Sequence, residues 1–271
     1  MKAVMPAQAQ GGRRLAPRTP WLAALFGAAI GLLFALIVFA PATWLGAGLL
    51  KVTNGHVQLQ DARGTVWNGS GRLLLTGGSG SKDKAVLPGL LAWELRPAWL
   101  GLTLKTDAAC CTPLPLQARF SLGWNTLEFK IENGVSQWPA ALMVGLGTPW
   151  NTVQADASLQ LSTRDLVFKL FDGRLAVSGA AQLDALDVSS RLSKVSPMGS
   201  YQVAFTGGPA PTVKLTTLSG AFKLSGNGSW VGSRLRFNGL ASVEPDMANA
   251  FSNLLNIIGR REGVQSIITL G

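Results

Sequence analysis

The strongest feature of the hydropathy pattern is a run of twenty residues without a charge, from Trp21 to Ala40. A helix rises about 1.5 Å per residue, so a run of this length crosses the roughly 30 Å hydrocarbon core of a bilayer. Trp21 and Trp44 flank it, where aromatic side chains favour the membrane interface. The pattern predicts one transmembrane helix over residues 21–43, from Trp21 to about Thr43.

The charges around this run predict its orientation. Four basic residues and no acidic one precede it: Lys2, Arg13, Arg14 and Arg18. By the positive-inside rule, residues 1–20 form a short basic cytoplasmic arm, which also contacts anionic lipid, and the chain after the span is exported. A cleaved signal peptide is the alternative, because Ala40-Pro41-Ala42 has the spacing of small residues that is typical of a signal-peptidase cleavage site. The apolar run exceeds the about 7–15 residues of a secretory h-region, so we expect a retained anchor.

Beyond residue 55, apolar and polar residues alternate with a period of two, as in half-buried strands. Residues 118–122 and 126–131 flank Gly123-Trp124-Asn125 and predict a hairpin. Further strands are predicted over 56–60, 158–161, 165–170, 174–178, 202–206, 212–216, 221–225, 229–231, 234–238 and 264–270. Glycine-containing turns at intervals of about 8–12 residues favour an antiparallel, mainly β fold: a curved sheet, a sandwich or an open barrel.

Two helical segments interrupt the strands. Residues 139–147 predict a short apolar turn or helix. Residues 247–258 predict an amphipathic helix that Asp246 caps and Gly259 ends, with Arg260 and Arg261 favourable at its C-terminus. Its apolar stripe is predicted to pack on the sheet, and a docking helix is the alternative. The stripe consists of Met247, Phe251, Leu254, Leu255 and Ile258.

The exported part, residues 44–271, therefore forms one β-rich domain or two related ones. Gly64-Thr-Val-Trp67-Asn-Gly69 resembles Gly228-Ser-Trp230-Val-Gly232, and each is followed by alternating apolar residues. This internal similarity indicates either a duplication into two units of about 44–150 and 151–271, or only that hairpins with tryptophan have similar sequences.

Composition excludes much of known enzyme chemistry. Charged residues make up 14% of the chain, against about 25% in average soluble proteins, and His56 is its single histidine. His56 is interpreted as a surface strand residue, and Glu128 and Glu132 as a solvated, salt-paired face rather than a glycosidase pair. The sequence holds no nucleophile elbow, phosphate loop, dinucleotide fingerprint or metal-ligand spacing. We predict no catalytic, cofactor-binding or metal residues, and no enzyme.

Cys110 and Cys111 are adjacent, which is unusual. In an oxidising compartment they can bridge each other or pair between chains, and no nearby group activates a thiolate. A structural staple or an inert pair is favoured over a redox site, and the sequence leaves their redox state open.

Near the C-terminus, one face of the predicted sheet is basic and the other is apolar. Lys214, Lys223 and Arg234 alternate with apolar residues such as Val213 and Phe237. The favoured interpretation is a core inside and solvated charge outside. The alternatives are a basic surface for an acidic partner or lipid headgroups, and an apolar groove for acyl chains. Clustered Lys/Arg with interleaved aromatics are absent, so no nucleic acid is expected.

Several segments, in order along nearly the whole exported region, resemble protein N of the type II secretion system (general secretion pathway protein N) of Gram-negative bacteria. They are 62–71 (ARGTVWNGSG), 146–152 (LGTPWNT), 189–193 (SSRLS) with 197–201 (PMGSY), 217–220 (TLSG) with 224–230 (LSGNGSW), and 258–261 (IGRR) with 266–271 (SIITLG).

The resemblance implies a single-pass inner-membrane protein with a cytoplasmic N-terminus and a β-rich periplasmic domain. It implies a non-enzymatic component of the machine that exports folded periplasmic proteins across the outer membrane, with other components of that system as partners. The family offers no catalytic residues or cofactors to carry over. The alternative is a periplasmic lipid-binding or lipid-transfer module with an AsmA-like curved sheet and an apolar groove. An envelope enzyme acting on glycan or lipid has the least support.

Overall fold

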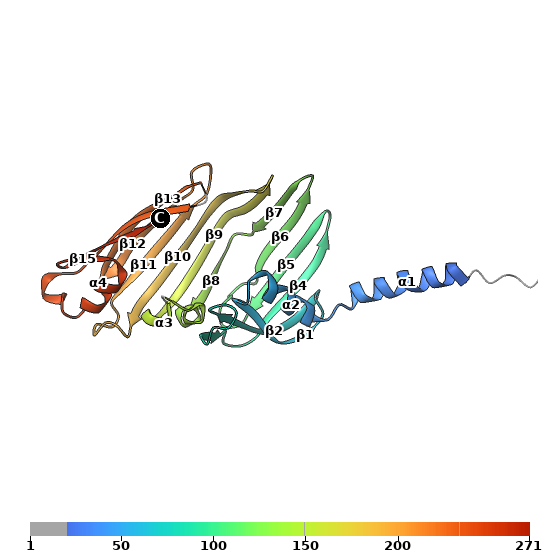
Figure 1. The fold of residues 1–271 in the computed structure, drawn as a ribbon, viewed down its shortest axis with the longest axis horizontal. Coiled ribbons are helices and arrows are strands. Elements are labelled where there is room, and N and C mark those ends of the chain that lie inside the picture. The colour runs from blue at the N-terminus through green and yellow to red at the C-terminus, as the bar shows by residue number, and fades with distance from the viewer. Residues whose placement is uncertain (1–20, 149, 233) are drawn as a thin grey trace, which may run out of the picture. The chain divides into compact units, whose positions relative to one another are not determined.

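A computed structural model describes residues 21–148, 150–232 and 234–271 (Figure 1). The chain divides into two compact units: the first ends at Phe39 and the second is Ala40–Gly271. The predicted basic arm, residues 1–20, lies outside the described residues.

Helix α1 (Trp21–Val38) accounts for the charge-free run. None of its residues is buried. Its length and apolar composition suffice to cross a membrane, and it is the one such helix among the described residues.

The end of this helix differs from the sequence prediction, which continued it to about Thr43. α1 ends at Val38, and a second helix, α2 (Ala42–Val52), begins after Pro41. Proline has no N–H group and disfavours helical geometry at the residue before it, so one helix cannot run through Ala40. Pro41 is instead extended, with φ −68° and ψ 146°, and pairs with Thr65 in an isolated bridge.

Sixteen strands within the described residues form one antiparallel sheet. They are β1 (Val57–Gly64), β2 (Asn68–Thr76), β3 (Lys84–Val86), β4 (Leu91–Ala98), β5 (Gly101–Ala108), β6 (Leu116–Gly123), β7 (Thr126–Ile131), β8 (Gly134–Pro139), β9 (Ala155–Phe171), β10 (Arg174–Ser190), β11 (Gly199–Thr206), β12 (Thr212–Gly220), β13 (Lys223–Val231), β14 (Arg234–Ser242), β15 (Arg260–Glu262) and β16 (Gln265–Leu270).

The order is β1-β2-β4-β5-β6-β7-β9-β10-β11-β12-β13-β14-β16-β15, with β3 beside β2 and β8 beside β9. The sheet is curved (Figure 1), and β1 and β15 are its two ends, so among the described strands it stays open. The prediction of a mainly β, curved antiparallel fold is confirmed. The division into two related units stays a prediction.

Many strands are longer than the sequence pattern predicts, and the largest differences are in β9, β10 and β13. The two short strands predicted within 158–170 are one strand, β9, and the predicted 174–178 is only the start of β10. Their register shifts between Ser178 and Ala180, at a β-bulge. A bulge adds one residue and interrupts the period of two without ending the pairing, which explains the predicted break. β13 likewise joins the predicted segments 221–225 and 229–231.

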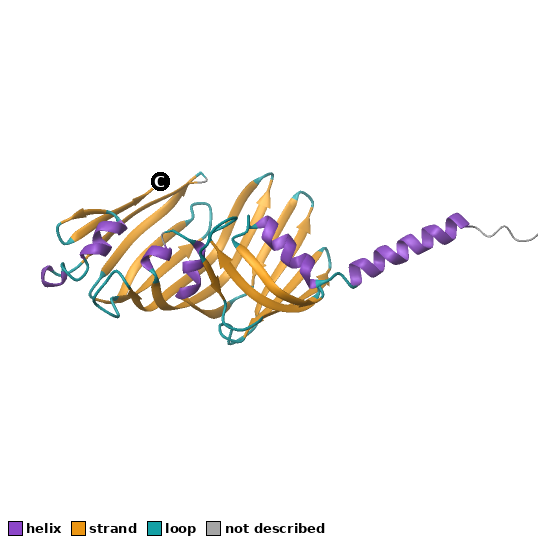
Figure 2. Cartoon of the chain, turned by 60° about the horizontal axis from the view of Figure 1, so that its bottom comes forward, coloured by secondary structure: helices purple, strands orange, loops and turns teal. Residues whose placement is uncertain are grey.

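The helices of this unit lie against one face of the sheet (Figure 2). Besides α2, they are η1 (Ala140–Leu146), α3 (Trp150–Val153), η2 (Pro245–Met247) and α4 (Ser252–Ile258). Phe251, Leu254 and Leu255 are buried in one cluster with Phe222 of the β12–β13 turn and Phe237 of β14. The prediction that this apolar stripe packs on the sheet is confirmed, as is the helical segment at 139–147.

The helix predicted over 247–258 is nevertheless shorter than expected. η2 and α4 are separate, and Asp246 forms no cap because α4 begins six residues later, at Ser252. Gly259 is extended, at φ −178°, rather than left-handed. Its lack of a side chain serves packing, since a Cβ there would lie 2.2 Å from the carbonyl oxygen of Ile267. Arg260 and Arg261 belong to β15.

Tyr201 supplies a buried hydrogen bond to this C-terminal core. Its hydroxyl donates to the carbonyl oxygen of Phe222 at 2.8 Å, and burial raises the pKa of the phenol, so the donor stays protonated. Tyr201→Phe should lower the free energy of unfolding by about 1–2 kcal/mol, because the buried carbonyl loses its partner. Urea denaturation of the full-length protein measures this. Ser219→Ala, which removes an exposed hydroxyl from β12, should change the stability by less than about 0.5 kcal/mol. Equal effects of both changes would contradict the prediction.

Candidate functional site

An apolar groove lies on the helix-covered face of the sheet, over its N-terminal half. Its volume is about 660 Å³, inside the range of about 300–1,000 Å³ that small-molecule sites occupy. The lining comes from α2, the β1–β2 turn, and strands β1, β2 and β4 to β7; ten of its sixteen residues are leucines, and Thr106 supplies the one hydroxyl. Such a surface suits a hydrocarbon ligand and offers nothing for polar chemistry.

Strand register brings these side chains together. Leu95 pairs with Leu104, and Leu102 pairs with Phe120 on the next strand. Side chains of directly paired residues lie on the same face, and alternate residues of one strand share it. The period-two pattern of each strand therefore builds one continuous apolar face.

Two glycines make room for the side chains of Trp93 and Leu59, which line the groove. A Cβ at Gly69 would lie 2.6 Å from the ring of Trp93 and 2.5 Å from the carbonyl oxygen of Arg63. A Cβ at Gly71 would lie 2.9 Å from Cδ1 of Leu59. Trp93 takes the freed space, is 5% exposed, and donates its indole N–H to the carbonyl oxygen of Val66 at 3.1 Å. These contacts fix the shape of the groove before any ligand enters.

Helix α2 forms one wall. Leu45 and Leu49, one turn apart, line the groove, as expected for residues at i and i+4. Trp44 and Leu50 on the same helix are 55% and 45% exposed. α2 is therefore apolar on its groove side and also carries apolar residues that no part of the described chain covers.

The apolar face continues past the groove as a row of aromatic rings. Phe120 on β6 stacks on Phe129 of β7 with ring centroids 4.5 Å apart, and Phe129 faces Phe168 of β9 at 6.0 Å. All three side chains are half-buried. The apolar track therefore extends from the groove into the middle of the sheet.

The titratable residues weighed from the sequence lie apart from this groove. His56 is exposed, and its Nδ1 lies 3.1 Å from the carbonyl oxygen of Thr76. Glu128 pairs with Lys169 at 3.1 Å, and Glu132, just past the end of β7, pairs with Lys130 at 3.7 Å. The salt-paired interpretation of both glutamates is confirmed. In the part of the chain that the structure describes, no group of three or more His, Cys, Asp or Glu is placed to hold a metal ion.

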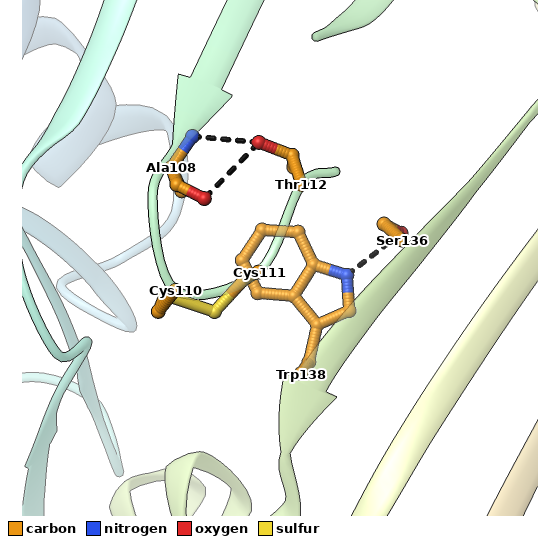
Figure 3. Close-up of a disulfide and its surroundings, with 6 residues drawn as sticks. All are labelled: Ala108, Cys110, Cys111, Thr112, Ser136 and Trp138. Carbon is orange, nitrogen blue, oxygen red and sulfur yellow. Dashed lines mark hydrogen bonds between the residues drawn. A yellow bond between two sulfur atoms is a disulfide. The ribbon is translucent and has the colours of Figure 1, made fainter. Parts of the chain in front are cut away.

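Cys110 and Cys111 form a disulfide with each other in the turn after β5 (Figure 3). Cys111 is 2% exposed and packs in a small core with Leu87, Ala108 and Leu142 of η1. Its N–H donates to the carbonyl oxygen of Ala108 at 2.8 Å, and its own carbonyl accepts from Gln137 at 2.7 Å. The bond therefore closes the turn after β5, and Cys111 holds that turn against β8 by a hydrogen bond and against η1 by packing. This matches a structural loop staple, one of the alternatives that the sequence left open.

The basic face near the C-terminus is present as predicted. Lys214, Lys223 and Arg234 are exposed, whereas Phe222 and Phe237 are buried. The favoured interpretation, with a core inside and solvated charge outside, is confirmed.

Comparison with models of protein families assigns the chain to a family. The model of the family described as type II secretion system (T2SS), protein N, matches residues 55–267. The chain belongs to this family. No curated protein and no solved structure matches it significantly. Members of the T2SS protein N family are components of a secretion system, and the family is not a known enzyme family.

Within this T2SS protein N chain, the matched residues include nearly the whole groove. The segment 62–71, one of those that carried the resemblance in the sequence, spans the end of β1, the β1–β2 turn and the start of β2, and contributes Val66 and Trp67 to the lining. The sequence offered an apolar groove only as an alternative and placed it on the C-terminal part of the sheet, whereas the groove lies over strands β1, β2 and β4 to β7. Gly69 and Gly71, close to Trp67 in the sequence, were the residues that could have indicated the groove. Their neighbours in space, Trp93 on β4 and Leu59 on β1, are known only from the register of these strands with β2.

Proposed function

We propose that the chain is a non-enzymatic component of the T2SS that is anchored in the inner membrane by α1. Its domain, residues 44–271, lies in the periplasm and supports the export of folded proteins across the outer membrane through contacts with other T2SS components. The family match carries this proposal. The exposed apolar helix α1, preceded in the sequence by four basic residues, supports the anchoring and a cytoplasmic N-terminus. No catalytic residue, cofactor or metal is assigned.

Two surfaces suit protein contacts. The basic face around Lys214, Lys223 and Arg234 is exposed and fits an acidic partner. The sheet ends in β1 on one side and in the short β15 on the other. Edge strands offer unpaired backbone groups to an added strand, so β1 is a second candidate contact.

A second candidate function is lipid binding, and the fully apolar groove is the observation that favours it. Nothing in the described chain fills the groove, and apolar surface of this extent is rare on monomers unless a ligand or partner covers it.

Photo-crosslinking in cells tests both. Probes replace Lys214, Lys223 and Arg234 on the basic face, and Leu73 in the groove. We expect the three basic positions to capture T2SS components, and the groove position to capture lipid if the second function operates. Deleting the gene should abolish or strongly reduce export while the levels of the other components stay normal. Unchanged export together with no T2SS crosslinks would overturn the main proposal.

A further inference from the structure

Three hairpins carry large exposed apolar side chains at one end of the sheet. Two-residue loops join β4 to β5 (Trp99-Leu100), β6 to β7 (Trp124-Asn125) and β9 to β10 (Asp172-Gly173). Gly101 pairs with Ser121, and Thr126 pairs with Phe171, so the three loops project from the same end (Figure 1). We call this the tip rim: Trp99, Leu100, Leu122, Trp124, Phe171 and Leu175.

The tip rim is unusually exposed for side chains of this kind. Trp99 is 94% and Trp124 is 99% exposed, and Leu175 is 64% exposed. Single exposed apolar residues are common, but several gathered on adjacent loops mark an interaction site.

Turn chemistry does not account for these residues. Two-residue hairpin loops favour asparagine, aspartate and glycine, as in Asp172-Gly173. Leu100 instead adopts a positive φ of 56°, which is an outlier for a bulky residue. A strained, exposed leucine beside an exposed tryptophan indicates a contact outside the folded domain.

The tip rim is continuous with the groove. Leu122 and Leu127 line the groove and are themselves 60% and 43% exposed, so the groove reaches the rim at the β6–β7 hairpin. The side-chain amide of Asn125 donates to the carboxylate of Asp172, which ties two of the tips together.

The chain enters the domain at this same end of the sheet. Ala40, two residues after the last residue of α1, accepts a hydrogen bond from the N–H of Val66 at 2.8 Å. Val66 lies in the β1–β2 turn, and the pairing of Gly69 with Trp93 shows that this turn is directed toward the same end as the β4–β5 loop.

We propose that the tip rim docks on the lipid leaflet at which the chain leaves the membrane, and that the groove behind it receives an acyl chain of a phospholipid from that leaflet. Tryptophan favours the membrane interface, and the exposed Arg174 at the start of β10 suits anionic headgroups. The inference rests on the proposed anchoring by α1.

The test places an environment-sensitive maleimide fluorophore on Trp99→Cys or Trp124→Cys in the full-length protein. Cys110 and Cys111 are held in their disulfide, so without reductant the new thiol is the one labelled. The matched control is Leu114→Cys, 76% exposed, in the loop between β5 and β6 at the opposite end of the sheet. Each protein is reconstituted in vesicles of phosphatidylethanolamine and phosphatidylglycerol that contain bromine-labelled acyl chains.

Bromine should quench the labels at positions 99 and 124 about threefold more than the label at position 114. Equal quenching at all three positions, or none at 99 and 124, would overturn the proposal. Shielding of the tip labels in cells with an intact secretion system but not in vesicles would assign the rim to a protein partner and also overturn it. Co-flotation with the vesicles tests the anchoring separately, so failure of α1 to insert is distinguishable from failure of the rim to dock.

Discussion

Replacing Phe251 with alanine is expected to lower the free energy of unfolding by about 3–5 kcal/mol, the range for removing a buried phenylalanine. Phe251 is fully buried, and its ring centroid lies 5.2 Å from that of Phe222, which is 1% exposed. It stands at the start of α4 and holds that helix on the sheet. The change therefore leaves a cavity between the sheet and α4 that rigid strands cannot close.

Phe171→Ala is the matched control, because the same atoms are removed from a side chain that is 54% exposed. Its loss should be below about 1 kcal/mol, as for surface substitutions. Urea denaturation of the full-length protein in detergent, followed by tryptophan fluorescence, gives both values. A Phe251→Ala loss as small as that of the control would show that α4 does not stabilise the sheet.

Local pattern sufficed for the hairpin of β6 and β7, where both strands obey the period of two and the turn residues lie between them. It did not suffice for β4 and β5, which also alternate, because their loop, Trp99-Leu100, lacks the residues typical of a two-residue turn. The hairpin of β6 and β7 was predicted from alternation around Trp124-Asn125, and Asn125 has the positive φ of 61° that such a loop needs. The outward charges of Lys214 and Lys223 followed from the same alternation. These features depend only on residues that are close together in the sequence, so they can be predicted from it.

The predicted strand boundaries were wrong where a glycine makes room for a side chain of a neighbouring strand and does not form a turn. Gly226 and Gly228 were taken to separate two strands, yet both lie inside β13. A Cβ at Gly226 would lie 2.4 Å from the ring of Phe237, and one at Gly228 would lie 2.7 Å from Cγ1 of Val213. These glycines make room for side chains of β14 and β12. Only the register of the sheet reveals this, because the partners are distant in the sequence.

Helix α2 and the groove depended on packing between distant segments. Residues 42–50 are mostly apolar and continue the hydropathy of the span up to Lys51. Pro41, at the N-terminus of α2, provides no side-chain cap. Gly46 packs on β1, and a Cβ there would be in ordinary van der Waals contact, 3.4 Å from the carbonyl oxygen of Leu59. The sequence analysis ended the span at about Thr43 and predicted no helix over residues 44–52, so this wall of the groove was not predicted.

Gly179→Ala is expected to lower the free energy of unfolding by about 2–4 kcal/mol, which combines a strained backbone with forced movement of a neighbouring strand. Gly179 sits at the bulge between β9 and β10 with φ +87°, a conformation that alanine adopts at a cost. A Cβ there would lie 2.1 Å from the carbonyl oxygen of Asp165. Its own carbonyl accepts a hydrogen bond from Gly207 at 2.8 Å, so the shift also reaches the end of β11.

Gly173→Ala separates the two contributions, because Gly173 has φ +72° at the tip of the same hairpin and nothing within 4 Å of an added Cβ. That variant retains the backbone strain and should lose only about 1 kcal/mol. Chemical denaturation of both variants gives the difference, which measures the close approach of β9 to the bulge. Equal losses would show that the bulge accommodates a side chain, and that β9 and β10 are held together by their ladder alone.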